Sequence, residues 1–226
     1  MRFENTEVWG FNHALRGMRN PMDSWDKSDS RLDYDVLTED FIGKKDMKLA
    51  QQLIRAGSEH RKFMRQIFVS VDIVAPLFWW KEFDTYKVGT VRNSCSTMHK
   101  IHVKSFEESD FTHHGIDEVG KRATETFEIV LETLEWLRIN FNQTKEKKYW
   151  RAIIELLPDG YEMRATITLS YENLLGMCSK GQRRFHKQNE WSGIDCYIDE
   201  NFIEWARILP YAQELIFIDE EDNNNK

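Results

Sequence analysis

The spacing of apolar side chains changes near residue 60 from a helical to a strand period, and this change constrains the fold more than any other feature. Over residues 46 to about 57 the apolar positions fall on one face of a helix, with Asp46 as the expected N-cap. Over residues 63–73 apolar and polar residues alternate, which is typical of a half-buried strand, and Pro76 ends the alternation. A chain that carries both periods in succession is predicted to form a mixed α+β fold.

Further helices and a second strand are predicted along the rest of the chain. Asp117 is the expected N-cap of a long helix that reaches about residue 140 and places Val119 on its apolar face. Residues 161–169 alternate like a second strand after a turn at Asp159-Gly160. The other helices are expected near residues 9–18, from Leu77 onward, from about Trp150 to Pro158, near 171–187 and near 199–209.

Length and composition indicate one globular domain. A chain of 226 residues can bury a substantial core, and 41% hydrophobic with 31% charged residues is ordinary for a folded protein. We therefore expect a single α+β domain over residues 1–218, with several long helices and a small sheet. The acidic and Asn-rich residues 219–226 are expected to form a disordered tail.

Charge, hydropathy and cysteine content argue against several classes of protein. The net charge of −7 argues against a partner that is a nucleic acid polymer, because bulk affinity for phosphates needs Lys and Arg. No apolar run approaches the roughly 18 residues of a membrane span, and the N-terminus lacks the apolar core of a secretory signal. Cys95, Cys178 and Cys196 are odd in number and far apart, which favours a reducing compartment. A cytoplasmic protein is expected.

Standard site motifs are missing from the sequence. The pairs His99/His102 and His113-His114 each lack the three or four converging ligands that a metal needs, so no metal site is expected. The phosphate-binding loop, the dinucleotide-binding glycine pattern and the hydrolase serine motif do not occur. Neither hydrolase chemistry nor a standard nucleotide-binding fold is therefore indicated.

The segment 79–100 has the composition of an anion-binding loop. Hydroxyls, cationic side chains and main-chain N–H groups together hold phosphates, and Gly89 permits close approach of the backbone. The same composition also suits a polar loop exposed to solvent, and Trp79-Trp80 suits either the core or a wall that stacks on a flat ring. The hydroxyls are Thr85, Thr90, Ser94, Ser96 and Thr97, and the cations are Lys81, Lys87, Arg92 and Lys100.

At these residues the sequence resembles the flavin-dependent thymidylate synthases. Their signature R-H-R-x-x-S-x-N-x-x-S-x-R follows a Glu-His pair and a strand, and here Glu59-His60 precedes the strand at 63–73. Aligned without a gap, the signature begins at Trp80 and ends at Arg92. The family's later leucine-proline, strand and arginine-bearing helix match Leu157-Pro158 and the segment that follows. The resemblance spans roughly residues 45–190, and Trp80-Lys81-Glu82 stands where the family has R-H-R.

The resemblance implies a reaction and a set of roles. The reaction would be the reductive methylation of dUMP, or of a related pyrimidine nucleotide, with methylenetetrahydrofolate, FAD and NADPH, in a homotetramer. Two alternatives stay open: a nucleotide-binding protein without flavin redox activity, and an unrelated α+β domain whose motif spacing is accidental. The implied substrate-binding residues are Thr85, Lys87, Thr90 and Arg92; the cofactor-binding residues are Glu59, His60, Trp80 and Lys81; and either Arg183 or Arg184 would be the catalytic arginine that faces the substrate.

Overall fold

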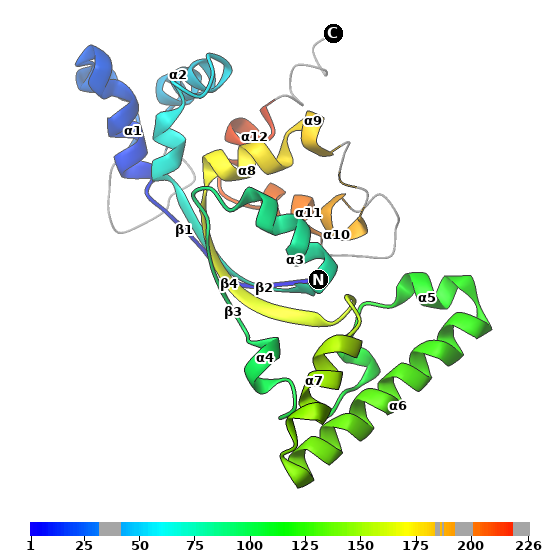
Figure 1. Ribbon diagram of the computed structural model, residues 1–226. Helices are drawn as coiled ribbons and strands as arrows, with labels where there is room; N and C mark the ends of the chain where they lie inside the picture. Colours follow the sequence, from blue (N-terminus) through cyan, green and yellow to red (C-terminus); the bar gives the residue numbers. More distant parts are fainter. Residues whose placement is uncertain (32–41, 184–185, 187, 193–200, 219–226) are drawn as a thin grey trace. The chain divides into compact units, whose positions relative to one another are not determined.

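The computed structural model describes residues 1–31, 42–183, 186, 188–192 and 201–218 of the chain (Figure 1). The chain divides into two compact units, each of which is described by itself. Unit 1 comprises Met1–Asp72, Tyr86–Arg92 and Thr166–Lys226, and unit 2 comprises Ile73–Thr85 and Asn93–Ala165. The predicted tail over 219–226 lies outside the described residues, so the predicted domain bounds stay a prediction.

A small antiparallel sheet of four strands confirms the predicted α+β fold class. The strand order is β1-β2-β4-β3, so that β2 and β4 are central. The predicted strands correspond to β2 and β4, while β1 was not anticipated and residues 62–66 form a 3-10 turn instead of the start of a strand. The strands are β1 (Arg2–Trp9), β2 (Phe68–Pro76), β3 (Val91–Ser94) and β4 (Glu162–Ser170).

Polar side chains tie β1, β2 and β4 together along one face of the sheet in unit 1. The hydroxyls of Ser70 and Thr168 lie 2.6 Å apart, and Thr166 Oγ1 donates to Asp72 Oδ1. Asn5 Nδ2 on the edge strand donates to Asp72 Oδ2 over 2.9 Å. Because side chains alternate along a strand, the residues between these polar positions point to the other face, where Val69, Val71, Ile167 and Leu169 are buried.

The helices of unit 1 are short, and they pack on one another around α1, α8 and the 3-10 turn Lys62–Gln66. Gly10 precedes α1 at φ 100°, and a Cβ there would lie 2.0 Å from the Gln66 carbonyl oxygen, so this entry to the helix requires glycine. The predicted helix at 171–187 is interrupted after Cys178. The helices are α1 (Phe11–Arg19), α2 (Lys44–Arg55), α8 (Tyr171–Cys178), α9 (Lys180–Arg183), α10 (Asn189–Ser192), α11 (Phe202–Arg207) and α12 (Ala212–Leu215), with 3-10 turns at Asn20–Met22 and Trp25–Lys27.

The helices of unit 2 surround an aromatic core. The longest is α6, which packs against α7 (green in Figure 1), and their shared cluster includes Phe111, Phe127, Leu134 and Ile153. The elements are α3 (Leu77–Phe83), which a 3-10 turn at Asp84–Tyr86 follows, α4 (Thr97–Lys100), a 3-10 turn at Glu108–Asp110, α5 (His114–Val119), α6 (Lys121–Thr144) and α7 (Lys147–Leu156).

Two predicted helix starts are wrong. Asp117 lies inside α5, since Gly120 at φ 109° separates α5 from α6, and Val119 is 80% exposed instead of facing a core. Asp46 lies inside α2, whose N-cap is Gly43. The carboxylate that caps α2 comes from Asp29, whose oxygens accept from the N–H groups of Lys45 (2.9 Å) and Asp46 (3.1 Å). The hydrogen bond from the Lys45 N–H, above all, lowers the pKa of Asp29.

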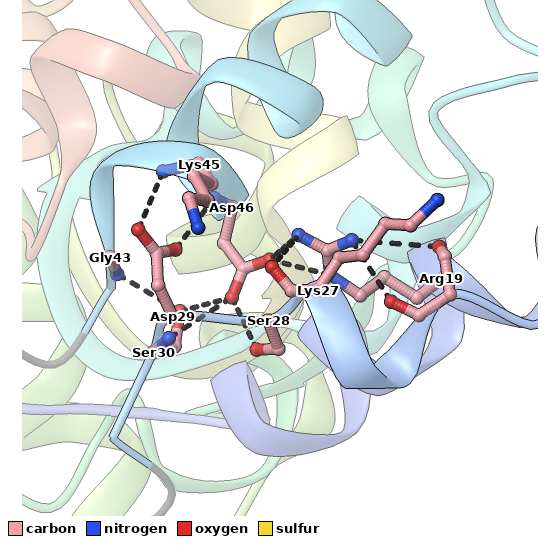
Figure 2. A network of polar contacts seen from close by, with 9 residues as sticks. Arg19, Lys27, Ser28, Asp29, Ser30, Gly43, Lys45 and Asp46 are labelled. Carbon is pink, nitrogen blue, oxygen red and sulfur yellow. Dashed lines mark hydrogen bonds and ion pairs between the residues drawn. The ribbon is translucent and has the colours of Figure 1, made fainter.

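Asp46 is instead the centre of a buried polar network in unit 1, which Figure 2 shows. Its side chain is 0% exposed and forms an ion pair with Arg19, whose Nε donates to Oδ1 over 2.6 Å. Its other oxygen accepts from the hydroxyls of Ser28 (2.6 Å) and Ser30 (2.5 Å). Arg19 also donates to the carbonyl oxygens of Ser24 and Lys27. The network joins α1, the segment 24–30 and α2.

Candidate functional site

The signature segment forms a tight turn at Lys87–Thr90 in unit 1. The Thr90 N–H donates to the Lys87 carbonyl oxygen over 3.3 Å, which closes a four-residue turn. Gly89 occupies its third position at φ 78°, the value that a type II turn requires there and that glycine adopts without strain. Lys87, Val88 and Gly89 are exposed, so the turn presents a cation and main-chain groups to solvent.

Two side-chain contacts, one part-buried and one exposed, hold this turn against the rest of unit 1. On one side Tyr86 Oη lies 2.9 Å from Nε2 of His186, which is 2% exposed. The His186 ring stacks on Trp191 with ring centroids 4.2 Å apart. On the other side, Asn173 Nδ2 of α8 donates to the Val88 carbonyl oxygen over 2.8 Å. The sequence pattern predicted neither contact, because both join positions that are far apart along the chain.

The predicted substrate-binding residues differ in what they offer a phosphate. Thr90 Oγ1 donates to the Tyr86 carbonyl oxygen over 3.4 Å, a long bond that a phosphate oxygen could replace at little cost. Thr85 Oγ1 in unit 2 donates to the Glu82 carbonyl oxygen near the end of α3 over 2.8 Å. Lys87 is exposed and Arg92 is half-buried at the start of β3. Unit 1 thus carries Lys87, Thr90 and Arg92 on one turn and the strand that follows it.

The predicted cofactor-binding residues lie in both units. In unit 1 Glu59 and His60 are exposed in the turn that follows α2, and Glu59 pairs with Lys62 at 3.4 Å. In unit 2 Lys81 Nζ pairs with Asp159 at 2.5 Å, with both side chains exposed. Trp80 is 2% exposed, and its Nε1–H donates to the Met163 carbonyl oxygen over 2.9 Å. Of the two roles open for Trp80, the core and a stacking wall, the structure places it in the core.

The two candidate catalytic arginines lie at the edge of the described residues. Arg183 is the last residue of α9, and Arg184 falls outside the described part of the chain. The choice between Arg183 and Arg184 therefore stays a prediction.

Two arginines that the sequence analysis did not single out, Arg61 and Arg65 of the segment after α2, bind Glu172 on the first turn of α8. Arg61 Nε is 3.2 Å from Glu172 Oε1, and Arg65 binds both oxygens of the same carboxylate. Burial raises the pKa of Glu172, but the hydrogen bonds from Arg65 and Arg61 outweigh it, and the pKa lies below its ordinary value. The spacing of the two arginines, four residues apart, was the only local signal for this cluster.

We expect Glu172→Gln to lower the free energy of unfolding at pH 7 by about 1–2 kcal/mol, because it removes a mostly buried charge from two guanidinium groups. A pKa that is lower in the folded than in the unfolded state stabilises the fold above the unfolded value, and this contribution is lost as the pH falls through the folded value. Urea unfolding at pH 7 and at successively lower pH should therefore show the two proteins converging. An equal difference at every pH would contradict this account, and Glu204→Gln, which removes an exposed carboxylate paired with Arg207, is the control.

The described residues contain no group of three or more His, Cys, Asp or Glu side chains that could hold a metal ion. Among the helices of these same residues, none combines the length and the apolar character needed to cross a membrane. At the start of α5, His113 Nδ1 lies 2.9 Å from Asp117 Oδ2, and His113 Nε2 lies 3.6 Å from Glu108 Oε1.

Comparisons with known proteins identify the fold. No family model matches the sequence, and no curated protein matches it. Among solved structures, two of the flavin-dependent thymidylate synthase ThyX from Helicobacter pylori, each with FAD and dUMP, are similar to this chain at 13% identity. The alignments cover 97% of this chain and 99% and 98% of the ThyX chains, with TM-scores of 0.61 and 0.59. At this identity the likeness shows that the chain has the ThyX fold, as the sequence resemblance implied.

Proposed function

We propose that this protein binds dUMP, or a related pyrimidine nucleotide, and acts as a thymidylate synthase-like enzyme. The observation that carries the proposal is the fold, which matches a ThyX chain solved with FAD and dUMP over 97% of this sequence and 99% of that one. Fold alone does not fix function, so the argument also needs residues at the site. The turn at Lys87–Thr90 and Arg92 supply them, because they stand where the resemblance places the phosphate of the nucleotide.

The chemistry of the turn suits a phosphate monoester. Arg92 and Lys87 would supply the positive charges, with a guanidinium able to donate two parallel hydrogen bonds to phosphate oxygens. Thr90 would turn its hydroxyl from the Tyr86 carbonyl to the phosphate, and the Gly89 N–H would add a main-chain donor. Arg183 or Arg184, in the segment that follows β4, would also face the nucleotide.

The residues that align with R-H-R do not fit a flavin in the arrangement described. Trp80 is buried with its N–H bonded to Met163, and Lys81 is paired with Asp159. Neither offers the pair of arginines that the family places there, so no step through FAD is derived for this chain. This observation favours a second candidate function: a nucleotide-binding protein with the ThyX fold that does not carry out the redox reaction with FAD, NADPH and methylenetetrahydrofolate.

We expect Arg92→Ala to weaken the binding of dUMP about 10- to 100-fold, or about 1.4–2.7 kcal/mol, because it removes a charge-assisted contact to the phosphate. Calorimetric titration with dUMP measures the change, and the melting temperature shows whether the variant is folded. Arg122→Ala, which removes an exposed cation from α6 in unit 2, is the matched control and should bind like the wild type. Equal affinity of Arg92→Ala and wild type for dUMP would contradict the proposal that Arg92 binds the phosphate.

The absorption spectrum of the purified protein separates the two candidate functions. A flavin band together with dUMP binding supports the enzyme. A colourless protein that dUMP stabilises against heat supports nucleotide binding without redox chemistry, since a ligand that binds only the folded state raises the melting temperature. A protein that binds neither FAD nor dUMP contradicts both and leaves only the fold.

A further inference from the structure

The side chain of Asn173 has two separate sets of contacts at the N-terminus of α8. Its Oδ1 accepts from the Ser170 N–H (3.0 Å) and from the Ser170 hydroxyl (2.8 Å), while the Asn173 N–H donates back to that hydroxyl over 3.3 Å. These contacts form the capping box of the helix. Because Oδ1 faces two donors in Ser170, the orientation of the amide is fixed and its NH₂ group points the other way.

The NH₂ group of Asn173 reaches the central peptide of the turn at Lys87–Thr90. Nδ2 donates to the Val88 carbonyl oxygen over 2.8 Å, and a Cβ built on Gly89 would lie 3.5 Å from both polar atoms of the amide. The Asn173 amide therefore lies against the peptide that joins Val88 to Gly89. This is the only peptide whose orientation distinguishes a type II turn from a type I turn, in which it is flipped by roughly half a rotation.

The hydrogen bond selects one of these two orientations. With its carbonyl held by Asn173, the peptide directs the Gly89 N–H to the opposite side, because the N–H and C=O of a trans peptide point in opposite directions. Gly89 itself permits either turn, since it adopts positive and negative φ with similar ease. The chosen conformation therefore comes from Asn173 and not from the turn sequence alone.

The first turn of α8, which carries Asn173, is anchored by contacts of its other residues. The preceding side chain, Glu172, binds Arg61 and Arg65 of the segment after α2. The residue before that, Tyr171, is 0% exposed; its N–H donates to the Ile67 carbonyl oxygen (2.9 Å) and its hydroxyl to that of Pro210 (2.6 Å). The first turn of α8 is thus fixed to the body of unit 1 before any ligand binds, which is what a positioning residue needs.

We propose that Asn173 is a positioning residue that locks the turn at Lys87–Thr90 in the conformation that presents the Gly89 N–H, with Lys87 and Thr90, to the nucleotide phosphate. The inference rests on the proposed function for the identity of the anion, and on the hydrogen bonds of Asn173 with Ser170 and Val88 for the conformation. Asn173 acts through the main chain and does not itself touch the phosphate.

Asn173→Asp and Ser170→Ala separate this role from helix capping. Asn173→Asp keeps an acceptor for Ser170 and places a negative charge in the first turn of α8, so the cap persists. It loses the donor to Val88, and the new carboxylate accepts from the Gly89 N–H once the peptide flips. We expect an unchanged melting temperature, a shifted and more slowly exchanging Gly89 amide signal by nuclear magnetic resonance, and dUMP binding about tenfold weaker.

Ser170→Ala should behave in the opposite way. It removes the hydroxyl of the cap but keeps the donation from Asn173 to Val88, so the melting temperature should fall by about 2–4 °C while the Gly89 signal and dUMP affinity stay within twofold of wild type. If Asn173→Asp leaves the Gly89 amide unchanged, the inference is overturned, whether or not dUMP binds. If wild type does not bind dUMP but the Gly89 amide responds as described, the conformational role stands and the proposed function fails.

Discussion

Replacing Asp46 with Ala is expected to lower the free energy of unfolding by about 3–5 kcal/mol, which is a large share of the stability of a typical domain. The Asp46 side chain is 0% exposed, and that of Arg19 is 6% exposed. Removal of the carboxylate leaves the guanidinium buried and without an anionic partner among its described contacts, which are then the carbonyl oxygens of Ser24 and Lys27 and the Ser24 hydroxyl. The hydroxyls of Ser28 and Ser30 lose their shared acceptor at the same time.

Urea unfolding followed by circular dichroism measures this loss, and two other variants locate its cause. Asp29→Ala removes an exposed carboxylate that caps the same helix, so it should cost only about 0.5–2 kcal/mol. The double variant Arg19→Met/Asp46→Leu removes both charges, and it should be more stable than Asp46→Ala, since no unpaired buried charge is left. A double variant as unstable as the single one would show that packing, and not the ion pair, stabilises this region.

The elements that the sequence predicted are those with a strong local period. Apolar and polar residues alternate clearly along β2 and β4, and the apolar run at Leu77–Trp80 forms the start of α3 after Pro76. The strand β1 was missed because Glu4, Asn5, Thr6 and Glu7 look like a polar loop. At an edge of the sheet, the main chain of such a segment pairs with β2, and its side chains can stay in solvent. Only the pairing partner, which lies far along the chain, identifies it as a strand.

The predicted helix caps were wrong for a related reason. Asp46 has the residue type and position of an N-cap, but the cap of α2 is supplied by Asp29, which precedes the helix in the sequence, and this frees Asp46 for the pair with Arg19. A carboxylate near a helix start is therefore an ambiguous signal, because capping and burial with an arginine use the same chemistry.

The candidate site shows the same division between local and distant signals. The motif spacing predicted a polar turn with Lys87, Thr90 and Arg92, and the turn exists. The contacts that fix it are not local: Asn173 and Val88 are separated by 85 residues, and Tyr86 and His186 by 100. Sequence reasoning could find the groups that would meet a phosphate, but not those that hold them in place.

We expect Trp80→Ala to destabilise the protein by about 3–5 kcal/mol, because it removes a large buried side chain from the core of unit 2. The indole packs edge-on against Trp79 and Phe83, with ring centroids 4.9 and 5.5 Å away, and its N–H satisfies the Met163 carbonyl. Trp80→Phe keeps most of the ring volume and loses the N–H, so a smaller loss of about 1–3 kcal/mol is expected. Urea unfolding of each variant measures these differences.

The comparison with Trp136→Ala decides between the two roles of Trp80. Trp136 lies on α6 in the same unit and is 56% exposed, so its removal should change the free energy of unfolding by about 0.5 kcal/mol or less. If Trp80→Ala is as mild as Trp136→Ala and abolishes a flavin band that the wild type shows, Trp80 stacks on the cofactor and the core assignment is wrong. If Trp80→Phe is less stable but keeps whatever ligand co-purifies with the wild type, the indole serves the core, and any flavin is held by residues outside the signature triplet.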